Sequence, residues 1–343
     1  MGLQAWSAVA LTLGASGCGR FAFDPEPDAG APDGSADAVD ALAVVCHGLA
    51  PTCGASGTDD CCASPPVTGG SYARSYDVSG DGNFANQAYV ATLSDYRLDK
   101  YEITVGRFRQ FVEAGFGTQA NPPAIGDGAH AGIGGSGWSS AFNTSLLADT
   151  TALIAALKCN ATEQMWTDVP GANENRPMNC ITWYEAFAFC IWDGGYLPTE
   201  AEWDYAAAGG SEQRAFPWSM PANLLSIDPS RGSYYDGVSC VGDGMAGCGA
   251  TDILPVGARP AGDGKFLQSD LGGNIWEWTL DKGATPYAIN PCIDCADLTS
   301  TGGRISRGGY FSAPIIYIRS ANRFGNGETF RVSEQGARCA RRF

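Results

Sequence analysis

The sequence predicts an α+β domain built from short helices, small sheets and much irregular coil. Two segments begin with a Thr-x-x-Glu capping box and end at paired glycines, a pattern that is typical of short helices. Two earlier segments alternate apolar and polar residues in places, which indicates strands. Between Gly210 and Arg304 the chain is rich in Gly and Asp with few long periodic segments, so much of its backbone must be irregular.

Length and charge limit the classes of protein to consider. The chain has 343 residues, and its first part differs in composition from the rest, which favours one large domain behind a tail. The 21 Lys and Arg against 37 Asp and Glu give a net charge of −16 at pH 7. This acidity opposes phosphate backbones, so no nucleic-acid partner is expected. Two histidines, His47 and His130, are too few for a three-histidine metal centre.

The N-terminus, residues 1–18, is predicted to be a signal peptide. Its apolar run from Ala5 to Leu13 is shorter than the roughly 20 residues needed to cross a membrane. The ending Ala-Ser-Gly-Cys resembles a bacterial lipobox, in which cleavage leaves Cys18 as the acylated first residue. No Lys or Arg precedes the apolar run, and an ordinary signal peptide is the alternative. We expect an exported protein, lipid-anchored to a bacterial outer membrane or cell surface, that meets the membrane through this anchor only.

The next segments differ in composition. Residues 19–44 are rich in Asp, Pro, Ala and Gly, so we expect a disordered acidic tether. Residues 45–64 form a Cys-rich segment, and residues 65–343 form the folded domain. If Cys18 is lipidated, twelve of the thirteen cysteines remain, which suggests up to six disulfides in an oxidising compartment. A local knot of bridges is expected among Cys46, Cys53, Cys61 and Cys62. A bridge that closes a small loop is expected between Cys240 and Cys248.

The first predicted elements of the domain are strands followed by a helix. Strands are expected within residues 67–77 and 89–104. Thr104 can then cap a helix that places Phe108, Phe111 and Val112 on one face. Residues 115–175 are expected to form a long surface loop with one helical piece near 145–157.

The strongest local signals come from two capping boxes. Thr182 and Glu185 form the first, and apolar residues then recur at i, i+3, i+4 and i+7 up to Cys190 before Gly194 and Gly195. Thr199 and Glu202 form the second box, with Trp203 and Ala206 behind it and Gly209 and Gly210 at its end. Each box predicts a helix that begins directly after its threonine.

Six segments in this order carry a resemblance to a known family: DKYEIT (99–104), PMNCITWYEAFAFC (177–190), LPTEAEWDYAA (197–207), DLGGNIWEWT (270–279), RISRGG (304–309) and GARCAR (336–341). The set resembles the formylglycine-generating enzyme, or sulfatase-modifying factor, family. An ordered set is far more specific than one short motif. The resemblance implies a single-domain, C-type-lectin-like α+β fold over residues 65–343 that is held in part by calcium.

The resemblance also implies two calcium sites. For the first, Asp270 and Glu277 offer carboxylate oxygens and Gly273 and Ile275 offer backbone carbonyls, the hard donors that calcium prefers. The alternative is that the flanking tryptophans are core residues and Glu277 merely ends a turn. The second site would fall at Asn223, Leu224 and Asp243, in a stretch that aligns loosely.

The expected activity of this family requires two cysteines shortly after a Gly-Gly-Ser motif, which hold copper as thiolates. The corresponding window here runs from Gly308 to Arg319, contains no cysteine and is about three residues shorter. Tyr310 replaces the serine of the family motif. Hydroxyl and alkyl groups do not replace soft thiolates as copper(I) ligands, so neither copper nor a catalytic residue is expected.

The scaffold residues of this region are expected to remain structural. Gly308, Gly309, Arg319 and Arg323 should help to build the fold. The three cysteines in the shared segments, Cys180, Cys190 and Cys339, should form bridges. The pair Cys292 and Cys295 forms one CxxC without the second pair that a zinc site would want, which favours a disulfide over a metal cluster.

These observations lead to two functional hypotheses. The first is a cell-envelope lipoprotein whose domain is a calcium-stabilised binding or structural module, without copper oxidase activity, for an unidentified protein or small-molecule ligand. A pilot or receptor protein of an envelope complex is a variant of it. The alternative is an enzyme of the sulfatase-modifying factor family that acts on a protein or small molecule, with formylglycine-generating oxidoreductase chemistry.

Overall fold

Three small sheets organise the chain in the computed structural model, which describes residues 48–80 and 85–343. The first sheet has the order β1-β4-β10, with β1 at Pro66–Val67, β4 at Tyr96–Leu98 and β10 at Ala340–Arg342. The second has the order β2-β3-β6, with β2 at Gly70–Ala73, β3 at Val90–Leu93 and β6 at Cys292–Ile293. The third has the order β8-β7-β5-β9, with β8 at Phe324–Asn326, β7 at Arg304–Arg307, β5 at Trp276–Lys282 and β9 at Gln335–Gly336.

In the described part of the chain, four α-helices accompany these sheets: α1 Val105–Glu113, α2 Thr150–Ala156, α3 Trp183–Trp192 and α4 Glu200–Ala207. Single 3-10 turns lie at Ser140–Ser145, Gly210–Glu212, Ala250–Asp252, Pro260–Gly262 and Ile315–Ile318. Long stretches between them are irregular, and the short helices and small sheets confirm the predicted fold class.

The caps of α3 and α4 confirm the two predicted capping boxes. Thr182 accepts a hydrogen bond from the backbone N–H of Glu185, whose carboxylate accepts one from the N–H of Thr182. Thr199 and Glu202 repeat this exchange at α4. Thr104 caps α1 as predicted. Each of these helices begins where its side chains satisfy the free N–H groups of the first turn.

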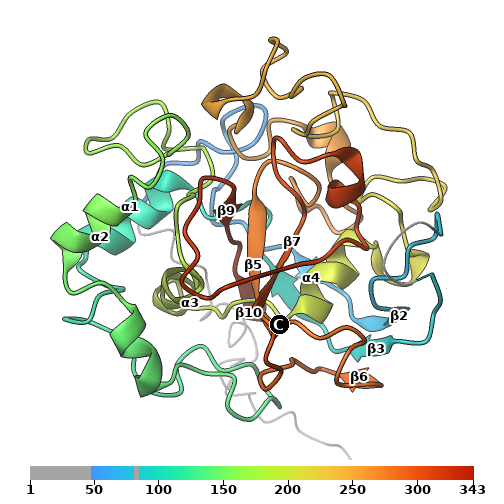
Figure 1. Cartoon of the computed structure of the whole chain (residues 1–343), viewed down its shortest axis with the longest axis horizontal. Coiled ribbons are helices and arrows are strands. Elements are labelled where there is room, and N and C mark those ends of the chain that lie inside the picture. Colours follow the sequence, from blue (N-terminus) through green and yellow to red (C-terminus); the bar gives the residue numbers. More distant parts are fainter. Residues whose placement is uncertain (1–47, 81–84) are drawn as a thin grey trace, which may run out of the picture. The chain divides into compact units, whose positions relative to one another are not determined.

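Strand β5 lies at the centre of the fold, where α3 and α4 both contact it (Figure 1). Tryptophan N–H groups tie the layers together. Trp183 of α3 donates to the carbonyl of Thr279, and Trp203 of α4 donates to the carboxylate of Glu277. The first six residues of β5 are buried. A strand that is covered on both faces shows no alternation, which is why the sequence did not reveal it.

The main core surrounds α1 and α3. Phe108 and Phe111 of α1 pack against Phe189 of α3, with ring centroids 5.5 and 5.6 Å apart. The helical piece predicted near 145–157 is shorter in the structure, because Asp149 rather than an earlier residue caps α2. A 3-10 turn precedes it. The apolar faces predicted for α1 and α3 are buried in this core. The helix predicted near 145–157 begins later, at Thr150.

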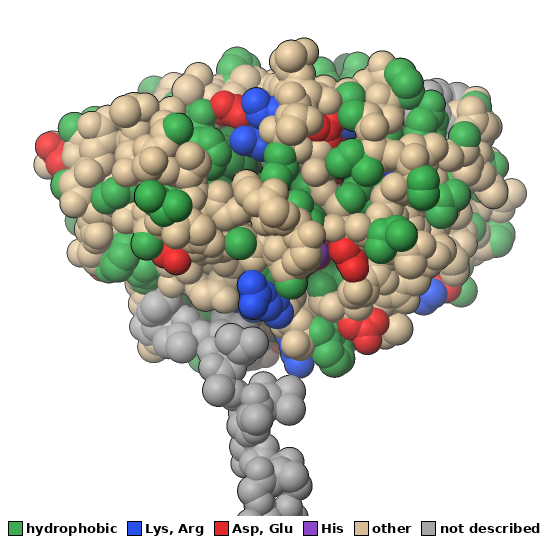
Figure 2. Space-filling model, turned by 90° about the horizontal axis from the view of Figure 1, so that it is seen from below, with side chains coloured by type: hydrophobic (Ala, Val, Ile, Leu, Met, Phe, Trp, Pro, Cys, Tyr) green, Lys and Arg blue, Asp and Glu red, His purple; other side chains and the backbone are tan. Residues whose placement is uncertain are grey.

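Several predictions concern residues that the structure does not describe. The signal peptide, Cys18, the tether and Cys46 lie outside the described residues. In the part that is described, no helix has both the length and the apolar character that a membrane crossing requires. On the face shown in Figure 2, Lys and Arg side chains lie apart from one another and alternate with Asp and Glu, so this face has no continuous basic patch.

Candidate functional site

A sharp turn after β7 starts the segment that forms one wall of the candidate site. Gly308 and Gly309 have φ angles of +96° and +74°, which side chains with a Cβ rarely adopt. A Cβ on Gly309 would lie 2.5 Å from Cγ2 of Ile318. The turn sends Phe311 into the core and leaves Tyr310 half-buried at the wall of a pocket. The two glycines are therefore structural, as predicted.

The arginines that frame this segment are also structural. Glu200 of α4 accepts hydrogen bonds from Arg307 and Arg323, each at 2.6 Å, and all three side chains are buried. Burial alone would raise the pKa of Glu200, but the two guanidinium groups hold it below its usual range. Arg319 pairs with Asp77 at 3.2 Å. The predicted fold-building role of Arg319 and Arg323 is confirmed.

The pocket itself has a volume of about 430 Å³. It is lined mainly by aromatic side chains and one carboxylate, contributed by Trp276, Tyr310, Tyr317, Phe324, Phe330 and Glu334. The parallel pairing of Trp276 in β5 with Gln335 in β9 brings the floor of the pocket beside the wall that holds Glu334. Burial and the nearby carboxylate of Glu334 raise the pKa of the Tyr310 phenol, which is therefore neutral at physiological pH.

Behind the pocket floor lies a buried carboxylate cluster made by Glu102, Asp270 and Glu277. Among the described residues, the guanidinium that acts on all three is that of Arg338. Arg338 donates to both oxygens of Glu277 at 2.6 Å, and both side chains are fully buried. Three carboxylates against one guanidinium leave an excess of two negative charges when all are ionised.

Glu102 is the least satisfied member of this cluster. Its side chain is fully buried, Oε2 accepts a hydrogen bond from Asn274 at 2.8 Å, and Oε1 has no hydrogen-bond partner among the described residues. Burial, together with the charges of Asp270 and Glu277, raises the pKa of Glu102 well above its ordinary range. Burial likewise raises the pKa of Asp270 to about 6. In the described residues the carboxylate oxygens of these three side chains do not all lie within 4.8 Å of one another, so the cluster is not a preformed three-carboxylate cation site.

The structure places the predicted ligands of the first calcium site in and beside this cluster. Asp270 accepts a hydrogen bond from the N–H of Gly257 at 2.6 Å, and Gly273 and Ile275 follow it in the turn before β5. Glu277 has partners in Arg338 and Trp203 that the sequence argument did not foresee. Its flanking tryptophans are core residues, as the alternative interpretation proposed, but Glu277 lies within a strand rather than at the end of a turn.

The residues suggested for a second calcium site lie in two different loops. Leu224 accepts a hydrogen bond from Ser219 through its carbonyl, and its neighbour Asn223 is exposed. Asp243 is exposed and accepts hydrogen bonds from the N–H of Met245 and the hydroxyl of Thr251. Within the described residues no hydrogen bond joins the two loops at these positions, and the second calcium site stays a prediction.

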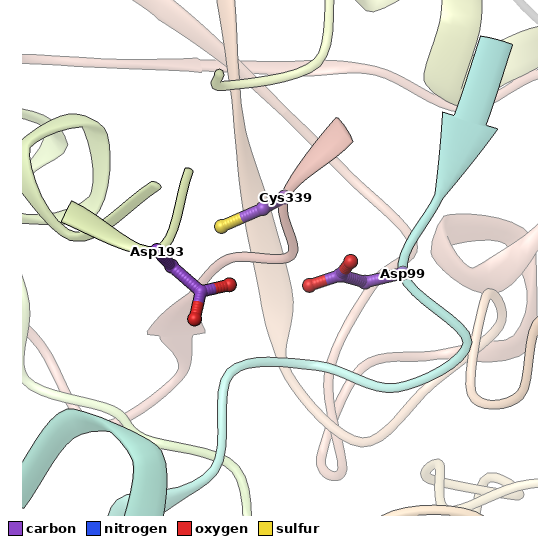
Figure 3. Close-up of side chains that lie close together, drawn as sticks. All are labelled: Asp99, Asp193 and Cys339. Carbon is purple, nitrogen blue, oxygen red and sulfur yellow. The ribbon is translucent and has the colours of Figure 1, made fainter. Parts of the chain in front are cut away.

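Another possible metal-ligand group is formed by Asp99, Asp193 and Cys339. Their ligand atoms, two carboxylate oxygens and one sulfur, lie within 4.8 Å of one another (Figure 3). Arg107 contacts both aspartates, at 2.9 and 2.6 Å, and Arg341 pairs with both as well. The sulfur of Cys339 is bonded to Cys190. Two arginines therefore balance two aspartates and no thiolate is available, so this group is a structural ion-pair network.

Disulfides account for every cysteine in the described residues. The bridges with both partners described are Cys53–Cys61, Cys159–Cys180, Cys190–Cys339, Cys240–Cys248 and Cys292–Cys295. The loop bridge at Cys240, the bridge within the CxxC pair and the structural role of the three scaffold cysteines are confirmed. Cys62 is also disulfide-bonded.

Sequence reasoning missed Phe324, Phe330, Glu334, Glu102 and Arg338. The first three line the pocket but belong to a stretch without periodicity, so only their spatial convergence reveals them. Glu102 and Arg338 do lie in the segments DKYEIT and GARCAR, where a charged residue beside apolar neighbours was a signal that each would be buried with a partner.

Comparison with known proteins relates this geometry to a family and a fold. Residues 58–343 match the family described as Sulfatase-modifying factor enzyme 1-like domain. The chain is 29% identical over 271 residues to the formylglycine-generating enzyme of Mus musculus, an alignment that covers 73% of this chain and 66%, slightly under two thirds, of that enzyme.

Two further similar proteins are one that is named inactive and one that is known from a solved structure. The chain is 30% identical over 211 residues to the inactive C-alpha-formylglycine-generating enzyme 2 of Bos taurus, which covers 56% of this chain and 61% of that protein. The structure of PvdO from Pseudomonas aeruginosa superposes with a TM-score of 0.55 at 20% identity, over 81% of this chain and 93% of that chain. The latter similarity shows a shared fold.

Proposed function

This chain belongs to the family of Sulfatase-modifying factor enzyme 1-like domains, and we propose that it is a calcium-stabilised binding module without formylglycine-generating activity. The module is held at a bacterial cell envelope through an acylated Cys18. Its ligand enters the aromatic pocket whose floor is Trp276.

The observation that carries this proposal is the chemistry of the pocket wall. The window from Gly308 to Arg319, where the resemblance places the copper-binding cysteines, supplies Tyr310 and Tyr317 to the pocket and contains no cysteine. The cysteines elsewhere in the described residues are held in disulfides, so they offer no thiolate. Copper(I) prefers soft thiolate ligands, and phenols do not supply them.

The relatives support both a catalytic and a non-catalytic use of this fold. One similar protein is named a formylglycine-generating enzyme and another an inactive one. Since family membership leaves activity open, the residues of the site must decide. Here they favour binding over oxidation, because the pocket offers aromatic faces and a carboxylate but no group that holds copper(I).

Calcium is proposed from the charge of the buried cluster. As the family resemblance implies, Asp270 and Glu277 would supply carboxylate oxygens, and Gly273 and Ile275 would supply backbone carbonyls. The Oε1 of Glu102, which has no hydrogen-bond partner among the described residues, supports a cation beside the cluster, because a buried carboxylate oxygen without a donor is costly unless the group is protonated or a cation lies near it. The cation would act as a structural ion that neutralises the cluster behind the pocket floor.

The test of the proposed function is an activity assay with a matched positive control. The purified protein and a relative that carries both cysteines are incubated with copper(I), reductant, oxygen and a sulfatase-motif peptide. We expect aldehyde formation by the relative only, and no tight copper(I) binding by this protein. Aldehyde above background from this chain would overturn the proposal and favour the enzymatic alternative.

A further inference from the structure

The aromatic pocket has the composition of a site for an organic cation. Deepening the proposed function, on which this inference rests, we propose that the pocket binds a small alkylated ammonium compound. The positive group would lie against the rings of Trp276, Tyr310 and Phe324, with its charge facing Glu334. The inference draws on three properties of the pocket: exposed rings, an uncompensated carboxylate and the absence of cations from its lining.

Large aromatic side chains are exposed around one hollow. Phe324 is 47% exposed, Phe330 is 46% exposed and Tyr317 is 40% exposed, and all three line the pocket. The floor, Trp276, lies with its ring centroid 5.9 Å from that of Phe324 and 6.2 Å from that of Tyr310. Clustered exposed rings around a hollow are typical of binding sites, whereas scattered ones are ordinary.

Among the described residues that line the pocket, the one charged side chain, Glu334, is negative. The carboxylate of Glu334 lies in the wall, and its Oε2 accepts a hydrogen bond from Ser333 at 3.1 Å. The one proton of this hydroxyl is shared with Glu163, whose Oε2 lies closer at 2.7 Å, and both carboxylates act on the Tyr310 phenol. In the described part of the chain neither carboxylate is paired with a Lys or Arg. A ligand that enters this pocket therefore meets the negative charge of Glu334, with that of Glu163 close behind it, which disfavours anions.

The arginines nearest in sequence are committed elsewhere. Arg319 pairs with Asp77, Arg323 with Glu200 and Arg331 with Glu185. None of them lines the pocket. Cation–π contacts do occur within the domain, as between Arg304 and Trp183 at 3.7 Å, but none that is present in the described residues uses a ring of the pocket. The rings are thus available to a cation from outside.

Physical chemistry favours an alkylated ammonium over a neutral ligand. Its methyl groups fit an apolar lining, while its positive charge is attracted to the negative faces of aromatic rings and to the carboxylate. A volume of about 430 Å³ accommodates one small molecule. A compact, strongly hydrated metal ion would gain little from rings, since it needs several oxygen donors.

The decisive comparison uses two probes of the same shape. Choline and its uncharged isostere 3,3-dimethylbutan-1-ol are titrated into the full exported protein by calorimetry, at matched ionic strength. We expect choline to bind at least about tenfold more tightly, because the isostere lacks the charge. Equal binding of the two, or no binding of choline, would overturn the inference, and neither result depends on a variant.

Two variants locate the site. Glu334→Gln keeps the shape of the side chain and Phe330→Leu keeps its apolar character, and each should weaken choline binding about 3- to 30-fold. Glu113→Gln, at an exposed carboxylate at the end of α1, is the matched control and should leave the affinity unchanged. If Glu334→Gln and Glu113→Gln behave alike, the cation does not bind at this pocket.

A further experiment distinguishes a small-molecule ammonium ligand from a methylated peptide. Its results, together with the copper assay, also distinguish failure of the ligand proposal from failure of the proposed function. A trimethyl-lysine peptide should bind no more tightly than choline; a peptide that binds more than about tenfold tighter would overturn the small-molecule assignment. Aldehyde formation in the copper assay would refute the proposed function whatever choline does. Loss of choline binding without aldehyde formation would refute the ligand class alone.

Discussion

Replacing Glu102 with glutamine should stabilise the metal-free domain and weaken its response to calcium. In the absence of a cation, Glu102 is buried with one oxygen unpartnered and with Asp270 and Glu277 acting on it. Glutamine retains an acceptor for Asn274 and carries no charge, so it is not repelled by Asp270 and Glu277. The same change removes one negative charge from beside the proposed calcium site, so calcium should stabilise the variant less than the native chain.

The magnitude follows from the cost of burying the carboxyl group. In the unfolded chain Glu102 has a pKa near 4.5 and is ionised at pH 7. Folding must either bury that charge or protonate it, and protonation across about 2.5 pH units costs about 3 kcal/mol, which caps the penalty. We therefore expect the metal-free variant to be more stable than the native chain by about 1–3 kcal/mol. Calcium at 100 times its dissociation constant should stabilise the native chain by about 2.7 kcal/mol.

The assay is urea unfolding at pH 7 in calcium-free buffer and in calcium, with native protein, Glu102→Gln and Glu113→Gln. The last replaces an exposed carboxylate and should match the native chain in both buffers. The stability advantage of Glu102→Gln over the native chain should be smaller in calcium than in calcium-free buffer. Equal stabilisation of all three proteins by calcium would show that Glu102 faces no cation, and no stabilisation of any would refute the calcium site.

Two further predictions concern the anchor and a histidine. Cys18→Ala should move the protein from the membrane fraction to the soluble exported fraction, as followed by fractionation and immunoblotting; retention at the membrane would contradict acylation. Burial lowers the pKa of His130, but the hydrogen bond to Glu202 at 3.0 Å, the charge of that carboxylate and the hydrogen bond to the Ala131 carbonyl together outweigh burial and raise the pKa above 6.5. The stabilising contribution is thus complete below pH 6.5 and is lost as pH rises through the folded-state value. The urea midpoint of the native protein should therefore fall between pH 5.5 and 8.5, and His130→Gln should make this fall smaller. An equal fall in the variant would refute the stabilising role of the His130–Glu202 contact.

The sequence predicted those elements whose signals are local. The capping boxes at Thr182 and Thr199 each lie within four residues, so α3 and α4 could be placed from the chain alone. Strand β5 was missed, because burial on both faces removes alternation.

The pocket and the buried cluster could not be predicted, because they depend on partners far apart in the chain. Arg338 neutralises Glu277 across 61 positions. The pocket requires the register that sets β9 beside Trp276, together with the turn that exposes Tyr310. Register is decided by packing and hydrogen bonding of whole strands, and no short motif records it. The family resemblance located the right segments but not these contacts.

Strand β5 also has a consequence for how this scaffold can diversify. Successive side chains of a strand point to opposite faces, so Trp276 belongs to the pocket while its neighbour Glu277 belongs to the buried ion pair with Arg338. Substitutions among the exposed rings touch neither Glu277 nor Arg338, and stability effects of residues without shared partners add independently. Evolution can therefore exchange one ligand specificity for another on the outer face while the inner face keeps the domain folded.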